Sequence, residues 1–176
     1  MGGLERYLEI RHLIDTGDLL EWRSRSILGW TIRAFTGRDV NHSSLCVRMP
    51  YGYDEPRRFL IEADSTGLEF RLISRQLERF DGVVWWYQLS RRYDHLRDAI
   101  GRWAFDCLAT NPGYDYLGLF AQAFGRVSLD ARRYFCSEFY DLMLANHGIA
   151  RPDPRGARRP GDFEDLGIFD QKIRVL

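Results

Sequence analysis

The sequence is poor in features that would place it quickly in a class of proteins. It has three cysteines, an odd number that cannot close a disulfide framework, so we expect a reducing compartment. Its 25 basic residues balance 25 acidic ones, and zero net charge argues against a protein whose main partner is the nucleic-acid backbone. Lys172 is the only lysine. We interpret this as coding bias, since arginine and lysine serve equally well on most solvated faces.

Long apolar runs are also missing. No stretch approaches the ~18 consecutive apolar residues that a membrane span needs. Residues 1–22 carry charges throughout and lack the apolar core of a secretory signal. Arg6 stands where a myristoylation signal has serine or threonine. We therefore predict a cytoplasmic protein without a membrane span, and leave its oligomeric state and its bacterial or phage setting open.

The composition is that of a globular protein, with 45% apolar and 14% aromatic residues in 176. This length predicts a single domain, 1–176. Alternation of apolar residues predicts strands at 17–22, 42–49, 58–64, 68–73 and 82–89. The third and fourth of these form a hairpin, and the last is the most apolar and should be central. A short helix is expected at 25–35.

The second half has helical periodicity. The expected helices lie at 91–110, 116–124 and 135–146. A loop at 151–161, a turn at 162–166 and an edge strand or tail at 173–176 complete the chain. Strands followed by helices indicate an α+β fold, with an antiparallel sheet from the first half packed on helices from the second.

The three cysteines differ in their surroundings. Cys107 lies in the apolar stripe of its helix and Cys46 on a strand, and both are typical packing positions. Cys136 stands at the start of the expected helix 135–146, directly after Arg132 and Arg133. Helix N-terminal amides and guanidinium groups both favour a thiolate, so Cys136 is the candidate nucleophile.

His42 and Glu62 are the candidate partners of that cysteine. His42 opens a strand after a loop, where an imidazole either points into a cleft or is an ordinary surface residue. Glu62 interrupts an apolar strand, and alternation places it on one face with Leu60 and Asp64. Such a carboxylate either faces solvent or pairs with a donor. Thiol hydrolysis needs a nucleophile, an imidazole and a residue that orients the imidazole, and these three side chains suit those roles.

Other polar residues favour no second site. His12, His95 and His147 are interpreted as solvated or capping residues. No group of His, Cys and carboxylates has metal-ligand spacing, so we predict neither a metal nor another cofactor. Four arginines in the 151–161 loop are interpreted as solvated rather than as a nucleic-acid site; they are Arg151, Arg155, Arg158 and Arg159. Four aromatic residues either line a cleft or pack ordinarily; they are Trp22, Trp30, Tyr114 and Tyr116.

Five segments in sequence order resemble the permuted papain-like amidases of the YaeF/YiiX kind, circularly permuted relatives of the NlpC-type cell-wall peptidases. The segments are Gly17-Asp18-Leu19-Leu20, residues 36–42 ending in Asn41-His42, Ile61-Glu62-Ala63, residues 134–139 with Cys136-Ser137-Glu138, and Pro160-Gly161-Asp162. The resemblance spans about residues 16–166. It implies a permuted papain-like domain in which Cys136 is the nucleophile, His42 the base and Glu62 the orienting residue.

The sequence departs from that family at two places. Ser43 and Ser44 stand where the family has an apolar residue and glycine, and Asp64 is an alternative orienting residue. The lecithin:retinol-acyltransferase-like relatives have a different context around their nucleophile. The resemblance therefore implies a thiol hydrolase that cleaves an amide in a small molecule or peptide, with a substrate related to peptidoglycan as one interpretation. An acyltransferase or thioesterase, or a catalytically silent binding module on the same fold, are the alternatives.

Overall fold

The structure is a computed structural model, and it describes residues 3–26, 37–50, 55–64, 67–110, 135–154 and 156–176. Its strands are β1 (Leu19–Ser24), β2 (His42–Met49), β3 (Arg57–Asp64), β4 (Gly67–Leu72), β5 (Gly82–Leu89) and β6 (Phe169–Arg174). Its helices are α1 (Gly3–Ile10), α3 (Ile73–Arg79), α4 (Arg97–Ala109) and α6 (Phe135–Asn146), with 3₁₀ turns η1 (Arg91–Leu96) and η3 (Phe163–Leu166).

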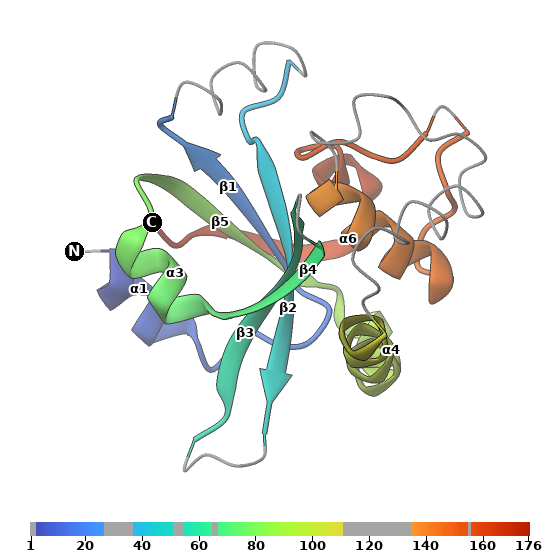
Figure 1. Cartoon of the computed structure of the whole chain (residues 1–176), viewed down its shortest axis with the longest axis horizontal. Helices are drawn as coiled ribbons and strands as arrows, with labels where there is room; N and C mark the ends of the chain where they lie inside the picture. Colours follow the sequence, from blue (N-terminus) through green and yellow to red (C-terminus); the bar gives the residue numbers. More distant parts are fainter. Residues whose placement is uncertain (1–2, 27–36, 51–54, 65–66, 111–134, 155) are drawn as a thin grey trace.

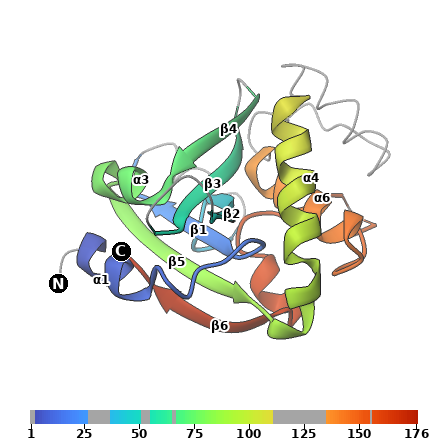
Figure 2. The same ribbon diagram turned by 90° about the horizontal axis from the view of Figure 1, so that it is seen from below.

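The six strands form one antiparallel sheet in the order β4-β3-β2-β1-β5-β6. Helices α4 and α6 lie on one side of the sheet and α1 and α3 on the other (Figures 1 and 2). The C-terminus ends beside α1 in both views. The domain is therefore a sheet between two helical layers.

Each face of the sheet has its own apolar cluster, because successive side chains of a strand point to opposite faces. Leu19 of β1 packs in the cluster that includes Phe139 and Met143 of α6. Leu20, the next residue, packs in the cluster with Tyr7 and Ile10 of α1. Burial on both faces explains why the inner strands have nearly continuous apolar runs rather than strict alternation.

The α+β class predicted from the sequence is confirmed. The strands at 42–49 and 82–89 and the helix at 135–146 have the predicted bounds, and the hairpin of β3 and β4 is present. The helix predicted at 91–110 begins with the 3₁₀ turn η1 and continues as α4. The helix predicted at 116–124 and most of the one at 25–35 lie outside the described residues.

The structure differs from the prediction in three details of the sheet and its layers. Strand β5 lies between β1 and β6, one strand from the edge, whereas β2 and β1 occupy the centre; β6 covers the edge that β5 would otherwise form. The predicted C-terminal edge strand is present as β6, but it begins at Phe169 rather than 173, since its pattern is too polar to show alternation. Helices also come from the first half of the chain: α1, and α3, which buries Ile73 and Leu77 one turn apart.

A buried carboxylate joins β1, β5 and α4. Asp18 has no exposed surface, and its Oδ1 accepts hydrogen bonds from the Leu89 N–H at 3.1 Å and from Arg97 Nη1 at 2.9 Å. Its Oδ2 accepts from the Asp15 N–H at 2.9 Å and from Trp86 Nε1 at 2.8 Å. Arg97 also donates to the carbonyl of Leu89, so one guanidinium links both strands to the start of α4. This network gives the Gly17-Asp18 segment a structural role.

Replacing Arg97 with methionine should destabilise the protein, because Asp18 keeps its burial and loses its cation. We expect a loss of roughly 3–5 kcal/mol in the free energy of unfolding at neutral pH, measured by urea denaturation. Burial raises the pKa of Asp18 to about 6, against the opposing effect of Arg97. The deficit of Arg97→Met should therefore shrink as pH falls and Asp18 becomes protonated.

The control for this change is Arg102→Met, since Arg102 is exposed on the same helix. It should leave stability nearly unchanged. Equal losses in the two variants, or a deficit for Arg97→Met that does not depend on pH, would show that the Asp18–Arg97 pair does not hold these elements together.

Candidate functional site

The fold brings the three candidate residues of the predicted site together at one end of the sheet. His42 is the first residue of β2, Glu62 lies near the end of the neighbouring β3, and Cys136 is the second residue of α6. Helix α6 packs against both strands. Residues that are far apart in the sequence thus meet because β2 and β3 are antiparallel neighbours beneath the same helix.

His42 and Glu62 form a direct hydrogen bond. The distance between His42 Nε2 and Glu62 Oε2 is 2.6 Å. The imidazole keeps 29% of its side-chain surface exposed, whereas the carboxylate keeps only 5%. A partly exposed ring that is held by a buried acceptor has a fixed orientation and remains accessible on one side. This is the geometry that an orienting carboxylate requires.

Two other side chains, Ser44 and Arg71, hold the Glu62 carboxylate, and Trp22 supports one of them. The hydroxyl of Ser44 donates to Glu62 Oε2 at 2.8 Å, and Trp22 Nε1 donates to that hydroxyl oxygen at 2.9 Å. Arg71 of β4 places Nη1 at 3.1 Å from Glu62 Oε1. Burial alone would raise the pKa of Glu62, but the hydrogen bonds and charges of His42, Ser44 and Arg71 outweigh it and lower the pKa. Glu62 is therefore ionised at neutral pH.

Cys136 completes the environment of the imidazole. Burial would lower the pKa of His42, but the charge and hydrogen bonding of Cys136 and of Glu62 outweigh it and raise the pKa well above the ordinary value. Since Glu62 occupies Nε2, Nδ1 is the ring nitrogen left for the Cys136 sulfur. The raised pKa favours the imidazolium form of His42, which lies between the Glu62 carboxylate and the Cys136 sulfur.

The other cysteines are separate from this site. Cys46 is fully buried in the cluster that contains Tyr7 and Leu60, and burial raises the pKa of its thiol well above the ordinary value. Cys107 is partly buried and packs against the cluster on the α6 side. Both positions agree with the packing roles predicted from the sequence.

Trp22 does not line a cleft. It is fully buried, donates its indole N–H to Ser44, and meets Phe80 edge to face. The packing alternative for Trp22 is the right one; Trp30, Tyr114 and Tyr116 lie outside the described residues. The side chain of Asp64 also lies outside what the structure describes, so the choice between Asp64 and Glu62 rests on the contacts of Glu62.

The arginine-rich loop 151–161 is only partly solvated. The backbone N–H of Arg158 donates to Asp141 Oδ2 at 3.1 Å, and its guanidinium pairs with the other oxygen of that buried carboxylate. Arg158 also donates to the carbonyl of Arg151 at 2.8 Å. The interpretation of Arg158 as solvated was therefore wrong, because this arginine anchors the loop to α6.

Sequence reasoning missed several residues that shape the site. Ser44 was noted only as a departure from a family pattern, and Arg71 was not considered. Glu21 of β1 is a buried carboxylate in an apolar strand, the same signal that singled out Glu62. Its Oε1 accepts from the Ser43 hydroxyl at 3.2 Å and from the Gly161 N–H at 3.0 Å. Gly161 has φ +88°, and a Cβ there would lie 3.0 Å from Arg38, so glycine is required at this turn.

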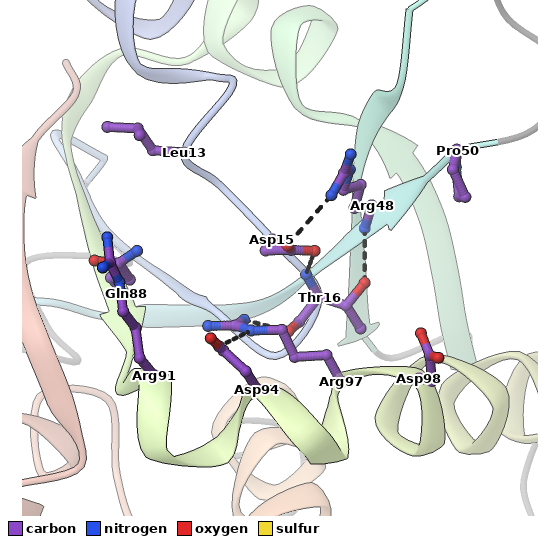
Figure 3. A pocket seen from close by; sticks show the side chains of 10 residues that line it. All are labelled: Leu13, Asp15, Thr16, Arg48, Pro50, Gln88, Arg91, Asp94, Arg97 and Asp98. Carbon is purple, nitrogen blue, oxygen red and sulfur yellow. Dashed lines mark hydrogen bonds and ion pairs between the residues drawn. The ribbon is translucent and has the colours of Figure 1, made fainter.

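A large polar cavity of about 520 Å³ lies at the other end of β2 from His42 (Figure 3). Arg48 and Pro50 line it together with residues from the start of the chain and from α4. Its charges pair with one another, as in Arg97 Nε with Asp94 at 2.8 Å and Arg48 with Asp15 at 3.5 Å. This cavity is therefore separate from the His42–Glu62 pair.

Membrane and metal sites were also considered for the described part of the chain. Each helix there is too short or too polar to span a bilayer. Within the same residues, no three or more His, Cys, Asp or Glu side chains are arranged to hold a metal ion.

Comparison with known proteins supports the fold. Neither the models of protein families nor the curated proteins give a match to this sequence. Among solved structures, YiiX from Escherichia coli O157:H7, described as a metalloprotein and as DUF1105, is similar with a TM-score of 0.53 and 20% identity. The match covers 78% of this chain and 68% of YiiX. The chain thus shares the fold of YiiX over most of its length.

Replacing Glu62 with glutamine should lower the pKa of His42. The ring keeps its burial but loses the carboxylate, so we expect a fall of roughly one unit or more. An NMR titration of the imidazole measures this directly. A raised histidine pKa stabilises the folded state below the unfolded value of the pKa, and this contribution is lost as pH rises through the folded value. Glu62→Gln should therefore flatten the pH dependence of unfolding there.

Glu69→Gln is the matched control, since Glu69 lies directly opposite Glu62 on β4 and hydrogen-bonds with Arg71. It should leave the titration of His42 nearly unchanged. If both variants shift the titration equally, the direct His42–Glu62 bond is not the cause.

Proposed function

We propose that the protein is a cysteine hydrolase with a permuted papain-like fold of the NlpC type, which cleaves an amide bond through an acyl-enzyme on Cys136. The observation that carries this proposal is the contact of one imidazole with both a buried carboxylate and a helix N-terminal thiol. The likeness in fold to YiiX and the sequence resemblance to the YaeF/YiiX amidases support it.

The chemistry follows from the atoms of these three side chains. The Cys136 sulfur attacks the carbonyl carbon, and the backbone N–H groups at the start of α6 stabilise the oxyanion. The imidazolium gives its Nδ1 proton to the leaving amine, and a thioester forms as the C–N bond breaks. Water then attacks the thioester and gives one proton to Nδ1; as the C–S bond breaks, the carboxylic acid leaves and the sulfur returns to its anionic form beside the imidazolium. Glu62 holds Nε2 throughout.

Ester and thioester substrates suit the same sequence of steps, because both pass through the same acyl-enzyme. An acyltransferase differs only in the acceptor that replaces water. A small-molecule or peptide amide, with peptidoglycan fragments as one source, is the proposed substrate. Trapping an acyl adduct on Cys136 from a library of amides or from a lysate, and weighing it, would identify the acyl group.

Alkylation with iodoacetamide tests the thiolate. We expect Cys136 to be labelled faster than Cys46 and Cys107 below neutral pH, because the imidazole of His42 lies beside its sulfur and can take its proton. This order differs from that of exposure, since Cys107 is more accessible than the buried Cys136. His42→Ala should slow labelling of Cys136 by roughly tenfold or more. Site-resolved mass spectrometry gives each rate.

His12→Ala serves as the control for that experiment, because His12 is exposed and distant in sequence from the site. If Cys107 is labelled fastest, in the order of solvent exposure, and His42→Ala does not change the rate at Cys136, then Cys136 is not an activated nucleophile. A Cys136 that reacts quickly but forms no acyl adduct with any amide, ester or thioester would favour the binding module instead.

Ser44→Ala should slow the same reaction by a smaller factor than His42→Ala. Ser44 donates to Glu62, and its removal leaves the Trp22 indole N–H and one carboxylate oxygen with a lost hydrogen bond each. We expect a decrease of several-fold in the labelling rate, because the carboxylate that orients His42 is held less firmly.

The adjacent Ser43 offers a matched control, because its hydroxyl donates to Glu21 instead of Glu62. Ser43→Ala should preserve both the labelling rate and the His42 titration. Equal effects of the two substitutions would mean that Ser44 acts only through general stability.

A further inference from the structure

A second cavity lies close to the candidate site, between the sheet and the segment that precedes His42. It has a volume of about 230 Å³. Glu21, Tyr87 and Gly161 form its buried part, and Asp39, Glu164 and Lys172 form its exposed rim. Glu21 pairs with Ser43 in the β1–β2 ladder, one residue from His42. The cavity is therefore large enough for a small polar group and open to solvent on one side.

The carboxylate of Glu21 is only half satisfied. Only 1% of this residue is exposed. Oε1 accepts from the Ser43 hydroxyl and the Gly161 N–H, whereas the buried Oε2 has no hydrogen-bond donor among the residues that the structure describes. A buried acceptor without a donor costs free energy, so a ligand that donates a hydrogen bond to this oxygen would be stabilised here.

The charges around the cavity indicate which charge the donating group of a ligand should have. Lys172 Nζ lies 2.8 Å from each carboxylate oxygen of Glu164, and Asp39 pairs with Arg23 at 2.9 Å. The remaining cation of the lining, Arg38, is bound to Asp162 and Asp165. Within the described lining, Glu21 is thus the carboxylate that receives only neutral donors. The missing complement is a positive charge.

The aromatic walls suit a cation as well. The Lys172 ammonium lies 5.2 Å from the centre of the Tyr87 ring and 5.8 Å from that of Trp85. Ring faces attract ammonium and guanidinium groups, and the Arg23 guanidinium lies 5.0 Å from the Trp85 ring on the same account. The aromatic rings beside the cavity therefore already contact one ammonium and one guanidinium group of the chain itself.

We propose that this cavity binds a small primary ammonium ligand, such as the amino end of an amino-acid amide, with Glu21 Oε2 as the acceptor of its hydrogen bond. A metal ion is the less suitable occupant, because no metal-binding group of side chains exists among the described residues. Burial raises the pKa of Glu21 to about 7, and a bound ammonium would favour its ionised form. The site uses none of the three proposed catalytic side chains.

Titration of ¹⁵N-labelled Cys136→Ser protein with glycinamide tests this proposal without any reaction taking place. The Gly161 amide resonance is the readout, because that N–H donates to Glu21. We expect a saturable shift with glycinamide and none with the neutral N-acetylglycinamide. Glu21→Gln keeps an acceptor for Gly161 and removes the charge, so it should weaken binding by about tenfold or more.

Two further variants keep the result decisive if Glu21→Gln alters the fold. Glu78→Gln removes an exposed carboxylate that is paired with Arg75 on α3 and does not line the cavity, so it should leave binding unchanged. Lys172→Gln removes the competing ammonium and should tighten binding several-fold. No saturable shift, equal shifts with the neutral probe, or unchanged binding in Glu21→Gln would overturn the proposal, and so would weaker binding in Lys172→Gln. The alkylation rate of Cys136 is measured separately, so failure of the proposed ammonium site can be distinguished from failure of the proposed hydrolase function.

Discussion

The buried carboxylate of Asp18 is the interaction on which the arrangement of the sheet depends. Its donors come from the turn before β1, from two positions on β5 and from the start of α4. Satisfying all of them sets β1 against β5 and the helix against both. Strand β1 in turn sets β2, with Trp22 opposite His42. The position of the imidazole at the end of the sheet thus follows from a carboxylate that takes no part in its chemistry.

Sequence patterns predicted those features that depend only on residues within one strand or helix. Alternation gave β2, helical spacing gave α6, and the carboxylate in an apolar strand singled out Glu62. The missed features depend on partners distant in sequence. Strand β6 is polar and exists through its pairing with β5, and Arg71 reaches Glu62 only because β4 folds beside β3. Glu21 also stands out as a carboxylate in an apolar strand, but its partners Ser43 and Gly161 are distant in sequence, so the sequence does not show its role.

The preference for arginine acquires a structural meaning in several places. Arg58 is buried, and its guanidinium donates to the backbone carbonyls of Ile14, Pro56 and His12. Arg97 makes a similar set of bonds around Asp18. A planar group with five donors can join several chain segments at once, which an ammonium on a flexible stem does less well. Coding bias alone therefore does not explain these positions, whereas the single lysine, Lys172, lies on the surface.

The order of the proposed catalytic residues along the chain has a consequence for biosynthesis. The strands that carry His42 and Glu62 are made first, and neighbouring antiparallel strands pair early because they are close in sequence. The cysteine follows on α6, after α4, and β6 is added last. A chain emerging from the ribosome thus carries the base and its orienting carboxylate well before its nucleophile. The proposed reactive centre therefore forms only after the strands have been made, when α6 brings the cysteine to a pair that already exists.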